Sequence, residues 1–366
     1  VSGAAQYGAD VRVPGMLFAS VERAPALGST LVRFDAAAVL KMPGVRHVHP
    51  LTAGILPGVA VVADDTWTAM RARRALSIEW APGAPASFDS DRYLADLPQA
   101  FERAHYKVRH EGDAAAALAD SARRVEATYV YPFQAHAPME TMNCTADVRK
   151  DAAEIWAPTQ TDVRTIEQVA KVTGLAPDAI RLHPVTMGGG FGRRLFSDYA
   201  AEAAEVSRAI GRPVQLLWTR EDDMRCGYFQ PATAERFTAG LDADGRIVAL
   251  VHTTTASDLT IYDIHGGRNI WTTAAPEKKP DHYESGASPW GAFDNPYEVP
   301  ALRVDCADVT SPVPVGPWRA VGYPSTVFAR ESFVDEIAHL LRKDPIDLRL
   351  ELLPPNVKAV GRQNID

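Results

Sequence analysis

Short apolar runs interrupted by proline and glycine dominate the first part of the chain. Runs of this kind are typical of β-strands, and one longer stretch has helical spacing instead. The predicted strands cover residues 16–21, 30–34, 45–49 and 58–62, and the predicted helix covers 65–75. Together these elements predict a small α+β domain over residues 1–84.

The next stretch differs in composition. Residues 81–121 are rich in proline, alanine, aspartate and serine, and only 93–105 has a weak helical pattern. Such a composition is typical of a segment that runs over a surface. We therefore expect a connecting segment over 85–124 and a second, larger domain over 125–366.

From residue 125 onward the pattern alternates between strands and helices. Thr161 is a candidate N-cap for a helix that Gly174 ends, and Gly211 ends another helix. Ser325 is the candidate N-cap of the last long helix, which reaches residue 341. The remaining expected elements are strands at 125–131, 143–148, 154–157, 180–185 and 214–218, a helix at 198–210, and a hairpin of 237–241 with 247–255. The fold class predicted is α+β, with a small α+β domain before a larger mixed α/β domain.

Composition and charge narrow the function classes. The formal net charge of −8 argues against a general surface for nucleic acid or anionic membrane. No apolar run approaches the roughly 20 residues of a membrane span. Cys144, Cys226 and Cys306 lie far apart without a Cys-x-x-Cys pair, so this chain alone supplies neither a zinc site nor an iron–sulfur cluster. Any electron relay is expected in another chain.

The most informative motif is a glycine-rich loop at residues 187–194, between a predicted strand and a predicted helix. Glycines let the backbone approach a ligand closely and turn its N–H groups toward anionic oxygens. The spacing excludes a Walker loop and a dinucleotide fingerprint, which disfavours an ordinary nucleotide-binding module. Two interpretations stay open from the residues alone: an anion cradle, or a strained turn that binds nothing.

This loop and two other segments, one before it and one after it, resemble the molybdenum hydroxylases, the family of xanthine dehydrogenase, aldehyde oxidoreductase and isoquinoline oxidoreductase. Gly-Gly-Phe-Gly at 189–192 is similar to the family's loop against the molybdenum centre. Residues 157–160 resemble its glutamine segment, and 316–324 resemble its Phe-Arg-Gly-Phe-Gly loop. The cofactor-binding residues that the resemblance implies are Gln160, Gly188, Gly189, Gly190, Phe191, Gly192, Arg193, Arg319 and Ala320. The implied substrate-pocket residues are Leu195, Trp318 and Val321, and Gln160, Phe191 and Arg319 are expected to meet around one cavity.

Further segments extend the resemblance over nearly the whole chain. Residues 3–10 and 14–17 match the start of the family's small hammerhead-like α+β domain, and 343–349 match the helix that closes its first molybdopterin-binding domain. His136 and Glu140 resemble a His-x-x-x-Glu segment of the family, which we interpret as structural because no third metal ligand is evident. We therefore expect no direct protein ligand to a metal.

Two arginines indicate the branch of the family. Arg193 and Arg194 follow the glycine loop, and Leu195 stands where xanthine dehydrogenases have a substrate-binding glutamate. This form resembles the isoquinoline oxidoreductase β-subunit and the membrane-associated aldehyde dehydrogenases. The resemblance implies hydroxylation or oxidation of an aldehyde or an N-heterocyclic aromatic, with water as the oxygen source.

The resemblance also implies further components. The expected cofactor is molybdopterin cytosine dinucleotide with molybdenum, and the expected partners are a small [2Fe–2S] subunit and a cytochrome c subunit. The family's general-base glutamate is absent, so we expect no catalytic residue here and interpret the chain as the central portion of a longer subunit. The alternative is a scaffold that binds no cofactor by itself. Family resemblance favours a periplasmic or membrane-associated location over a cytoplasmic one.

Overall fold

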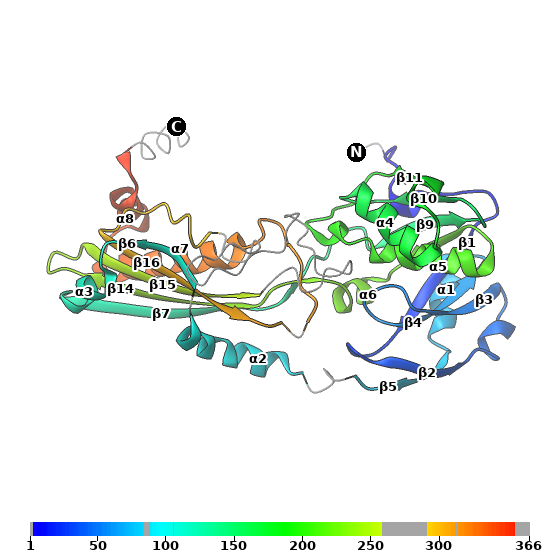
Figure 1. Cartoon of the computed structure of the whole chain (residues 1–366), viewed down its shortest axis with the longest axis horizontal. Coiled ribbons are helices and arrows are strands. Elements are labelled where there is room, and N and C mark those ends of the chain that lie inside the picture. Colours follow the sequence, from blue (N-terminus) through cyan, green and yellow to red (C-terminus); the bar gives the residue numbers. More distant parts are fainter. Residues whose placement is uncertain (1–2, 84–87, 105, 258–290, 312, 356–366) are drawn as a thin grey trace. The chain divides into compact units, whose positions relative to one another are not determined.

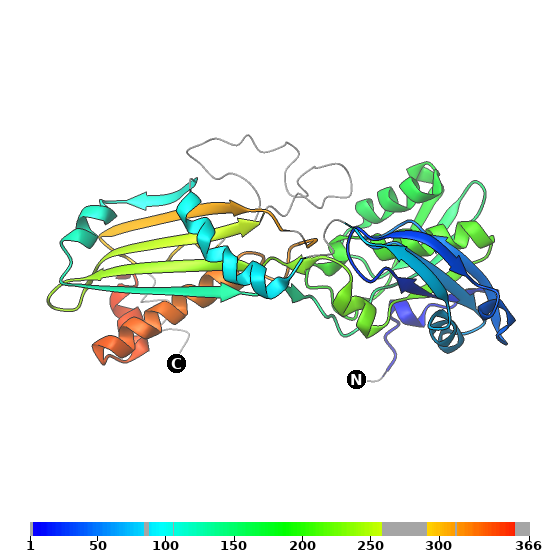
Figure 2. The same cartoon turned by 90° about the horizontal axis from the view of Figure 1, so that it is seen from below.

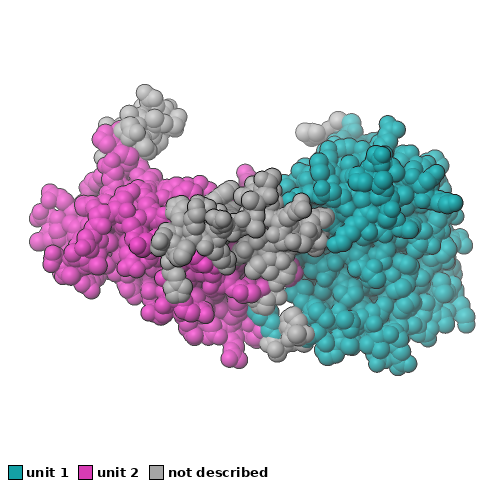
Figure 3. Space-filling model, viewed as in Figure 1, with its two compact units in different colours: residues 1–88, 135–228 teal, residues 89–134, 229–366 magenta. Residues whose placement is uncertain are grey.

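The computed structural model describes residues 3–83, 88–104, 106–257, 291–311 and 313–355 (Figure 1). Its two largest sheets have seven and five strands. They belong to two compact units, coloured separately in Figure 3. Unit 1 combines Val1–Phe88 with Ala135–Tyr228, and unit 2 combines Asp89–Gln134 with Phe229–Asp366. Each unit is therefore built from two separate stretches of chain, whereas the predicted domains are continuous.

The sheet of unit 1 joins the predicted small domain to the glycine-loop region. β1 pairs in parallel with β12 on one side and antiparallel with β4 on the other. The strand order is β11-β10-β9-β12-β1-β4-β3. The strands are β1 (Leu17–Arg23), β3 (Val45–Leu51), β4 (Gly58–Ala63), β9 (Asn143–Val148), β10 (Ala153–Ala157), β11 (Ile180–Pro184) and β12 (Val214–Leu217). β1, β3 and β4 of the predicted small domain are thus part of a larger sheet and do not form a sheet of their own.

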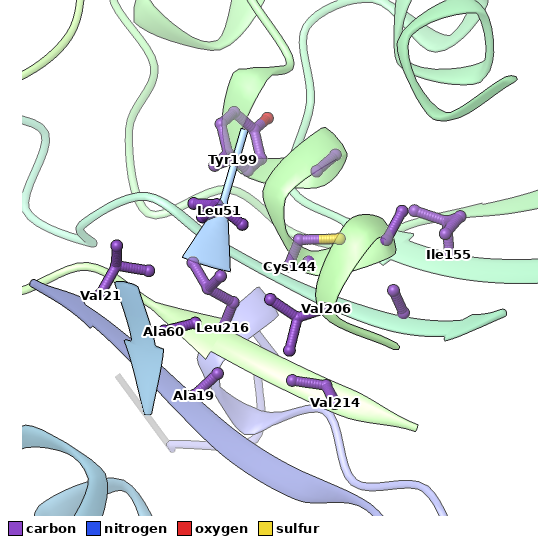
Figure 4. Packing of buried hydrophobic residues seen from close by; sticks show 14 of the residues in the cluster. Ala19, Val21, Leu51, Ala60, Cys144, Ile155, Tyr199, Val206, Val214 and Leu216 are labelled. Atoms are coloured by element: carbon purple, nitrogen blue, oxygen red, sulfur yellow. The ribbon is translucent and has the colours of Figure 1, made fainter. Parts of the chain in front are cut away.

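Both faces of this sheet are covered. Ala60 and Val62 of β4 lie in the large core cluster that includes α5 (Asp198–Ile210), whereas Val61 packs with Ala72 of α1 (Thr66–Arg73) in a second cluster. A strand buried on both faces has a continuous apolar sequence, as β4 does. Figure 4 shows labelled residues of the large cluster, contributed by α5 and by six strands of the sheet.

The helix ends around the site agree with the sequence. α4 (Asp162–Thr173) begins after Thr161 and ends at Gly174, and α5 ends at Gly211. Gly174 and Gly211 have φ of 70° and 66°, a left-handed conformation that favours glycine at a helix C-terminus. These predicted boundaries are confirmed.

Smaller elements complete unit 1. β2 (Thr30–Asp35) pairs with β5 (Ser77–Ala81) in a two-stranded sheet. The sequence analysis did not predict β5 or α6 (Arg220–Arg225). The short 3-10 helices are η1 (Gly8–Asp10), η2 (Val39–Lys41), η5 (Pro177–Ala179) and η6 (Arg193–Leu195).

Unit 2 is a five-stranded sheet with helices on both faces. Its order is β6-β16-β15-β14-β7, and Figure 2 shows α7 along one face and α2 on the other. The expected connecting segment 85–124 instead forms α2 (Ser90–Asp96), η4 (Leu97–Arg103), β6 (Tyr106–Glu111) and α3 (Ala114–Ala119). Leu97 and Phe101 give η4 an apolar face that packs on β14. The other strands are β7 (Arg123–Tyr131), β14 (Thr233–Leu241), β15 (Ile247–Ser257) and β16 (Ala301–Val309), with short β8 (Gln134–Ala135) and β13 (Phe229–Gln230).

The last long helix starts earlier than predicted. α7 (Tyr323–Leu341) has Gly322 as its N-cap and Pro324 in its first turn, where the missing N–H of proline costs nothing. Ser325 lies inside the helix, and its hydroxyl donates to the Gly322 carbonyl at 3.3 Å. The expectation of Ser325 as N-cap was therefore wrong. α8 (Pro345–Leu352) follows.

Candidate cofactor-binding site

The glycine loop lies in unit 1 between β11 and η6, and α5 follows. This confirms the predicted strand–loop–helix unit. Gly189 and Gly192 have φ of 101° and 102°, and Phe191 also has a positive φ of 54°. The Phe191 side chain is exposed, whereas Gly190 and Gly192 are buried. The backbone thus reverses sharply while one aromatic side chain faces solvent.

Three consecutive carbonyl groups of the loop, those of Gly188, Gly189 and Gly190, accept hydrogen bonds within unit 1. Gly188 O accepts from the Glu140 amide at 3.0 Å, and Gly190 O accepts from the Arg193 amide at 2.9 Å. Gly189 O accepts from Nε of Arg194 at 2.8 Å. The negative ends of these three peptide groups are therefore already paired.

Three consecutive amide groups of the same loop lie between two amides that are paired. Gly188 N–H donates to Oε2 of Glu140 at 2.8 Å, and Gly192 N–H donates to Oε1 of Gln160 at 3.1 Å. The amides of Gly189, Gly190 and Phe191 donate to no acceptor among the residues that the structure describes. Three consecutive N–H groups without acceptors form the kind of concavity that binds anionic oxygens.

Gln160 lies beside this row of amides with a fixed orientation. Its Oε1 accepts from the Gly192 amide at 3.1 Å and from the Arg194 amide at 3.3 Å. Because both partners are donors, the oxygen and the nitrogen of the carboxamide cannot be exchanged. The exposed NH2 group is left without an acceptor in the described part of the chain, so it adds two donors to the same site.

Two of the glycines are required by close contacts. A Cβ atom on Gly188 would lie 2.4 Å from Cβ of Glu140, and one on Gly190 would lie 2.5 Å from Oε1 of Gln160. Contacts this short demand that a neighbour move. The loop sequence therefore reflects the side chains packed beneath it.

The side chain of Arg193 is buried and paired inside unit 1, and the contact of Arg193 with the cofactor stays a prediction. Its guanidinium is 2% exposed and donates twice to Asp198, both at 2.8 Å. It also lies over the rings of Trp218 and Tyr228. Burial would lower the pKa of Arg193, but the Asp198 carboxylate outweighs burial and raises it. This side chain belongs to the support of α5.

Arg194 and Glu140 are the residues that the sequence-based site missed. Arg194 has no solvent exposure, and its guanidinium ion-pairs with Glu140 at 3.1 Å. Glu140 also accepts from the amide of Ala9 at 3.1 Å and from Nδ2 of Asn143 at 2.9 Å. The His-x-x-x-Glu spacing drew attention to Glu140, but the sequence did not indicate its partners. Nδ1 of His136 lies 3.1 Å from the carbonyl of Tyr228.

The second predicted loop lies in unit 2, before α7. Arg319 and Ala320 are exposed, and Ala320 and Val321 have positive φ of 70° and 54°. Val321 O accepts from Gln230 at 2.9 Å. Trp318 is half-buried, and its buried Nε1 has no partner among the described residues.

The structure brings some of the predicted residues together. Gln160, Phe191 and the glycines share one site in unit 1, and Leu195 is half-buried in η6. Trp318, Arg319, Ala320 and Val321 lie in unit 2. The expected convergence of Arg319 with Gln160 and Phe191 therefore stays a prediction.

No group of three or more histidine, cysteine, aspartate or glutamate side chains is arranged to hold a metal ion within the described ranges. In the same ranges, no helix has the length and apolar character to cross a bilayer.

A family model and two curated proteins are similar to most or nearly all of this chain. Residues 98–353 match the family model of the molybdopterin cofactor-binding domain. Isoquinoline 1-oxidoreductase subunit beta of Brevundimonas diminuta is 35% identical over 99% of this chain, which covers 46% of that relative. Membrane-bound aldehyde dehydrogenase (pyrroloquinoline-quinone) of Gluconacetobacter polyoxogenes is 30% identical over 99% of this chain, covering 47% of that protein.

A solved structure has the same fold. Quinoline 2-oxidoreductase from Pseudomonas putida 86 superposes with a TM-score of 0.71 at 21% identity, over 97% of this chain and 49% of that one. The chain spans about half the length of the curated relatives that it matches. The family match covers well over half of the chain and contains Gln160, the glycine loop and the loop before α7. The chain therefore belongs to the molybdopterin cofactor-binding domain family.

Proposed function

We propose that the glycine loop and Gln160 bind the oxygen-rich centre of a molybdopterin cofactor. The observation that carries this proposal is a set of hydrogen-bond donors without acceptors: the amides of Gly189, Gly190 and Phe191 and the NH2 group of Gln160. A site that offers only donors favours a ligand that offers only acceptors, such as oxo or phosphate oxygens. The residues present thus fit the cofactor for which the family is named.

The roles within the chain follow from this arrangement. Gly188 and Gly192 anchor the loop, Gln160 would donate to an oxygen of the bound cofactor, and Arg193 supports the loop through Asp198. When bound, the molybdenum cofactor supplies two-electron redox chemistry. We assign Arg319 and Ala320 to a second contact with it through their backbone, and Leu195, Trp318 and Val321 to the wall of the substrate pocket. The group that removes the proton from water is assigned outside this chain.

The activity of the whole protein is proposed from its relatives. The printed names of two relatives specify isoquinoline and aldehyde oxidation. We accordingly propose hydroxylation or oxidation of an N-heterocyclic aromatic or an aldehyde, with the cytosine dinucleotide form of the cofactor. A small [2Fe–2S] subunit and a cytochrome c subunit would accept the electrons, at the periplasmic side or at a membrane. The word subunit in the name of the isoquinoline enzyme agrees with a multi-chain assembly.

Cofactor analysis of the native, full-length protein tests the proposal. Molybdenum is measured by mass spectrometry of the metal, pterin by fluorescence after oxidation, and the nucleotide by release of cytidine monophosphate on hydrolysis. We expect all three in equal amounts. Protein that contains pyrroloquinoline quinone and no molybdenum would overturn the proposal, and so would a folded protein that contains neither.

A further inference from the structure

We propose that Arg194 is a positioning residue for the glycine loop. It holds the loop in the conformation in which the carbonyls of Gly188–Gly190 are paired inside unit 1 and the amides of Gly189–Phe191 stay available to the ligand. This inference rests on the proposed function, since it concerns how the same site is prepared. Arg194 itself has no exposed surface and lies beneath the loop. Its effect on a ligand would therefore be exerted through the backbone that it holds.

The guanidinium of Arg194 joins three segments that are far apart in sequence. Nε donates to Gly189 O at 2.8 Å, and Nη1 donates to Pro158 O at 3.2 Å. Nη2 donates to Glu140 O at 2.9 Å, to Glu140 Oε2 at 3.1 Å and to Thr141 O at 3.4 Å. One side chain thus fixes the glycine loop, the segment before Gln160 and the segment of Glu140.

The backbone of Arg194 holds Gln160 in addition. The Arg194 amide donates to Gln160 Oε1 at 3.3 Å, and the Gln160 amide donates to Arg194 O at 3.1 Å. These two bonds fix the main chain and the carboxamide of Gln160 together. A shift of Arg194 would therefore move both groups of donors that we assign to the ligand.

The geometry requires an arginine at this position. A guanidinium presents five donors in a rigid planar fork, whereas the ammonium group of lysine presents three from a single point. Lysine could keep the ion pair with Glu140 but could not also reach Gly189 O and Pro158 O, which accept from different edges of the guanidinium. The buried charge is compensated by Glu140, whose own position is fixed by the amides of Ala9 and Gly188.

The test is Arg194→Lys in the native, full-length protein, with Arg23→Lys as the matched control. Arg23 is also buried, and it donates twice to the buried Glu202 at 2.6 and 2.7 Å. It makes no hydrogen bond to the loop within the described part of the chain. Both variants keep a positive charge beside the carboxylate that pairs with the arginine, Glu140 or Glu202, so both test the loss of a buried guanidinium.

Two measurements separate positioning from simple loss of stability. Molybdenum and pterin per folded subunit should fall at least tenfold in Arg194→Lys and stay within twofold of wild type in Arg23→Lys. In cofactor-free protein, hydrogen exchange of the peptide that covers residues 186–196 should accelerate in Arg194→Lys alone, because the Gly188 and Gly192 amides lose their fixed acceptors. If Arg194→Lys does not fold, Glu140→Gln serves as the milder variant and should show the same two changes, with about a threefold fall in cofactor.

Equal cofactor content in both lysine variants, or unchanged exchange at residues 186–196, would overturn the role of Arg194. Absence of molybdenum and pterin from the wild-type protein would instead overturn the proposed function. The exchange measurement does not depend on cofactor, so the two failures are distinguishable.

Discussion

Two loops of this chain precede a helix and resemble cofactor loops, yet their backbones are fixed in different ways. In the loop of unit 1, Gly189 and Gly192 occupy two of the three positions with positive φ and Phe191 the third, and the Gly189 carbonyl is paired with the buried Arg194. The loop of unit 2 uses Ala320 and Val321 for left-handed positions, although neither is glycine. A β-branched residue at positive φ is an outlier that the surrounding structure must maintain.

The two loops thus fix their backbones for binding in two different ways. In the first loop, side chains packed against the backbone define which peptide groups remain free, and Phe191 is its one non-glycine residue at positive φ among the described residues. In the second loop the conformation costs about 1–3 kcal/mol per strained residue, which is offset by the bond from Gln230 to Val321 O and by the start of α7. We therefore expect substitutions in the first loop to act through hydrogen bonds, and substitutions in the second loop to act through strain.

The largest effect is expected from Gln160→Glu. The new carboxylate keeps an acceptor for the Gly192 and Arg194 amides but replaces the NH2 donors by a negative charge. Like charges facing each other cost several kcal/mol, so affinity for an anionic cofactor should fall about a hundredfold or more. Molybdenum content of the purified protein measures this loss.

Stability provides the control for Gln160→Glu. A charged acceptor forms stronger bonds to amides, so the urea midpoint should not decrease. A variant that keeps its full molybdenum content would remove Gln160 from the site and would leave the first loop without its side-chain donor.

The next largest effect is expected from Gly190→Ala. The added Cβ would displace the Gln160 carboxamide, which breaks two hydrogen bonds and costs about 2 kcal/mol. Urea unfolding measures the change. Gly211→Ala is the control, because nothing lies within 4 Å of its Cβ position and only its positive φ opposes alanine.

A double-mutant cycle sharpens this prediction. If Gly190→Ala acts through Gln160, it should cost almost nothing in a Gln160→Ala background, whereas the cost of Gly211→Ala should be the same in both backgrounds. Equal costs of Gly190→Ala in the two backgrounds would show that the glycine is needed for another reason.

Ala320→Gly should have a smaller effect of the opposite sign. Ala320 is exposed with φ of 70°, so glycine should relieve strain and raise the free energy of unfolding by about 1 kcal/mol. Ala116→Gly in α3, also exposed, should lower it by about 0.5–1 kcal/mol. Denaturant titration of both variants measures this, and a destabilising Ala320→Gly would contradict the account of strain in the second loop.

The smallest effect concerns pH and the helix that follows the second loop. Burial alone would raise the pKa of Glu331, but hydrogen bonds from Tyr297, Arg330 and Arg349 outweigh burial and lower it below 4.5. Because the folded-state pKa is depressed, this group stabilises the fold above about pH 4.5. The contribution decreases as pH falls from that value through the folded-state pKa.

Glu331→Gln removes this dependence. The unfolding midpoint of wild type should therefore decline more between about pH 6 and pH 3 than that of Glu331→Gln. Parallel pH profiles of wild type and Glu331→Gln would mean that the Glu331 carboxylate does not stabilise α7, the helix after the second loop.

Local elements were predictable from the sequence because their signals are local. α5 was predicted with its observed bounds, since apolar residues recur at helical spacing and Gly211 ends the helix. The positions of Gln160 and the glycine loop followed from motifs. β16, in contrast, was not predicted, although Leu302, Val304 and Cys306 alternate with Arg303 and Asp305 in the period-2 pattern of a strand.

Long-range pairing could not be predicted. The pairing of β1 with β12 joins Leu17 to Val214, and no periodicity in one sequence encodes such a contact. For the same reason the sequence did not reveal the role of Arg194, because its acceptors at 140, 158 and 189 come together only in the folded unit. The continuous domains that the sequence suggested differ from the observed units for this reason.

The pairing of β1 with β12 also means that the two neighbours of β1 are synthesised at different times. β1 can pair with β4 once residue 63 has left the ribosome, but its second neighbour begins at Val214. At ~5–20 residues per second, the roughly 150 residues between them take on the order of 10–30 s to be made. During that interval one edge of β1 has no native partner and offers its N–H and C=O groups to any other extended chain. Elongation rate, and the chaperones that cover this edge on the nascent chain, would therefore govern how much of the protein reaches the folded state.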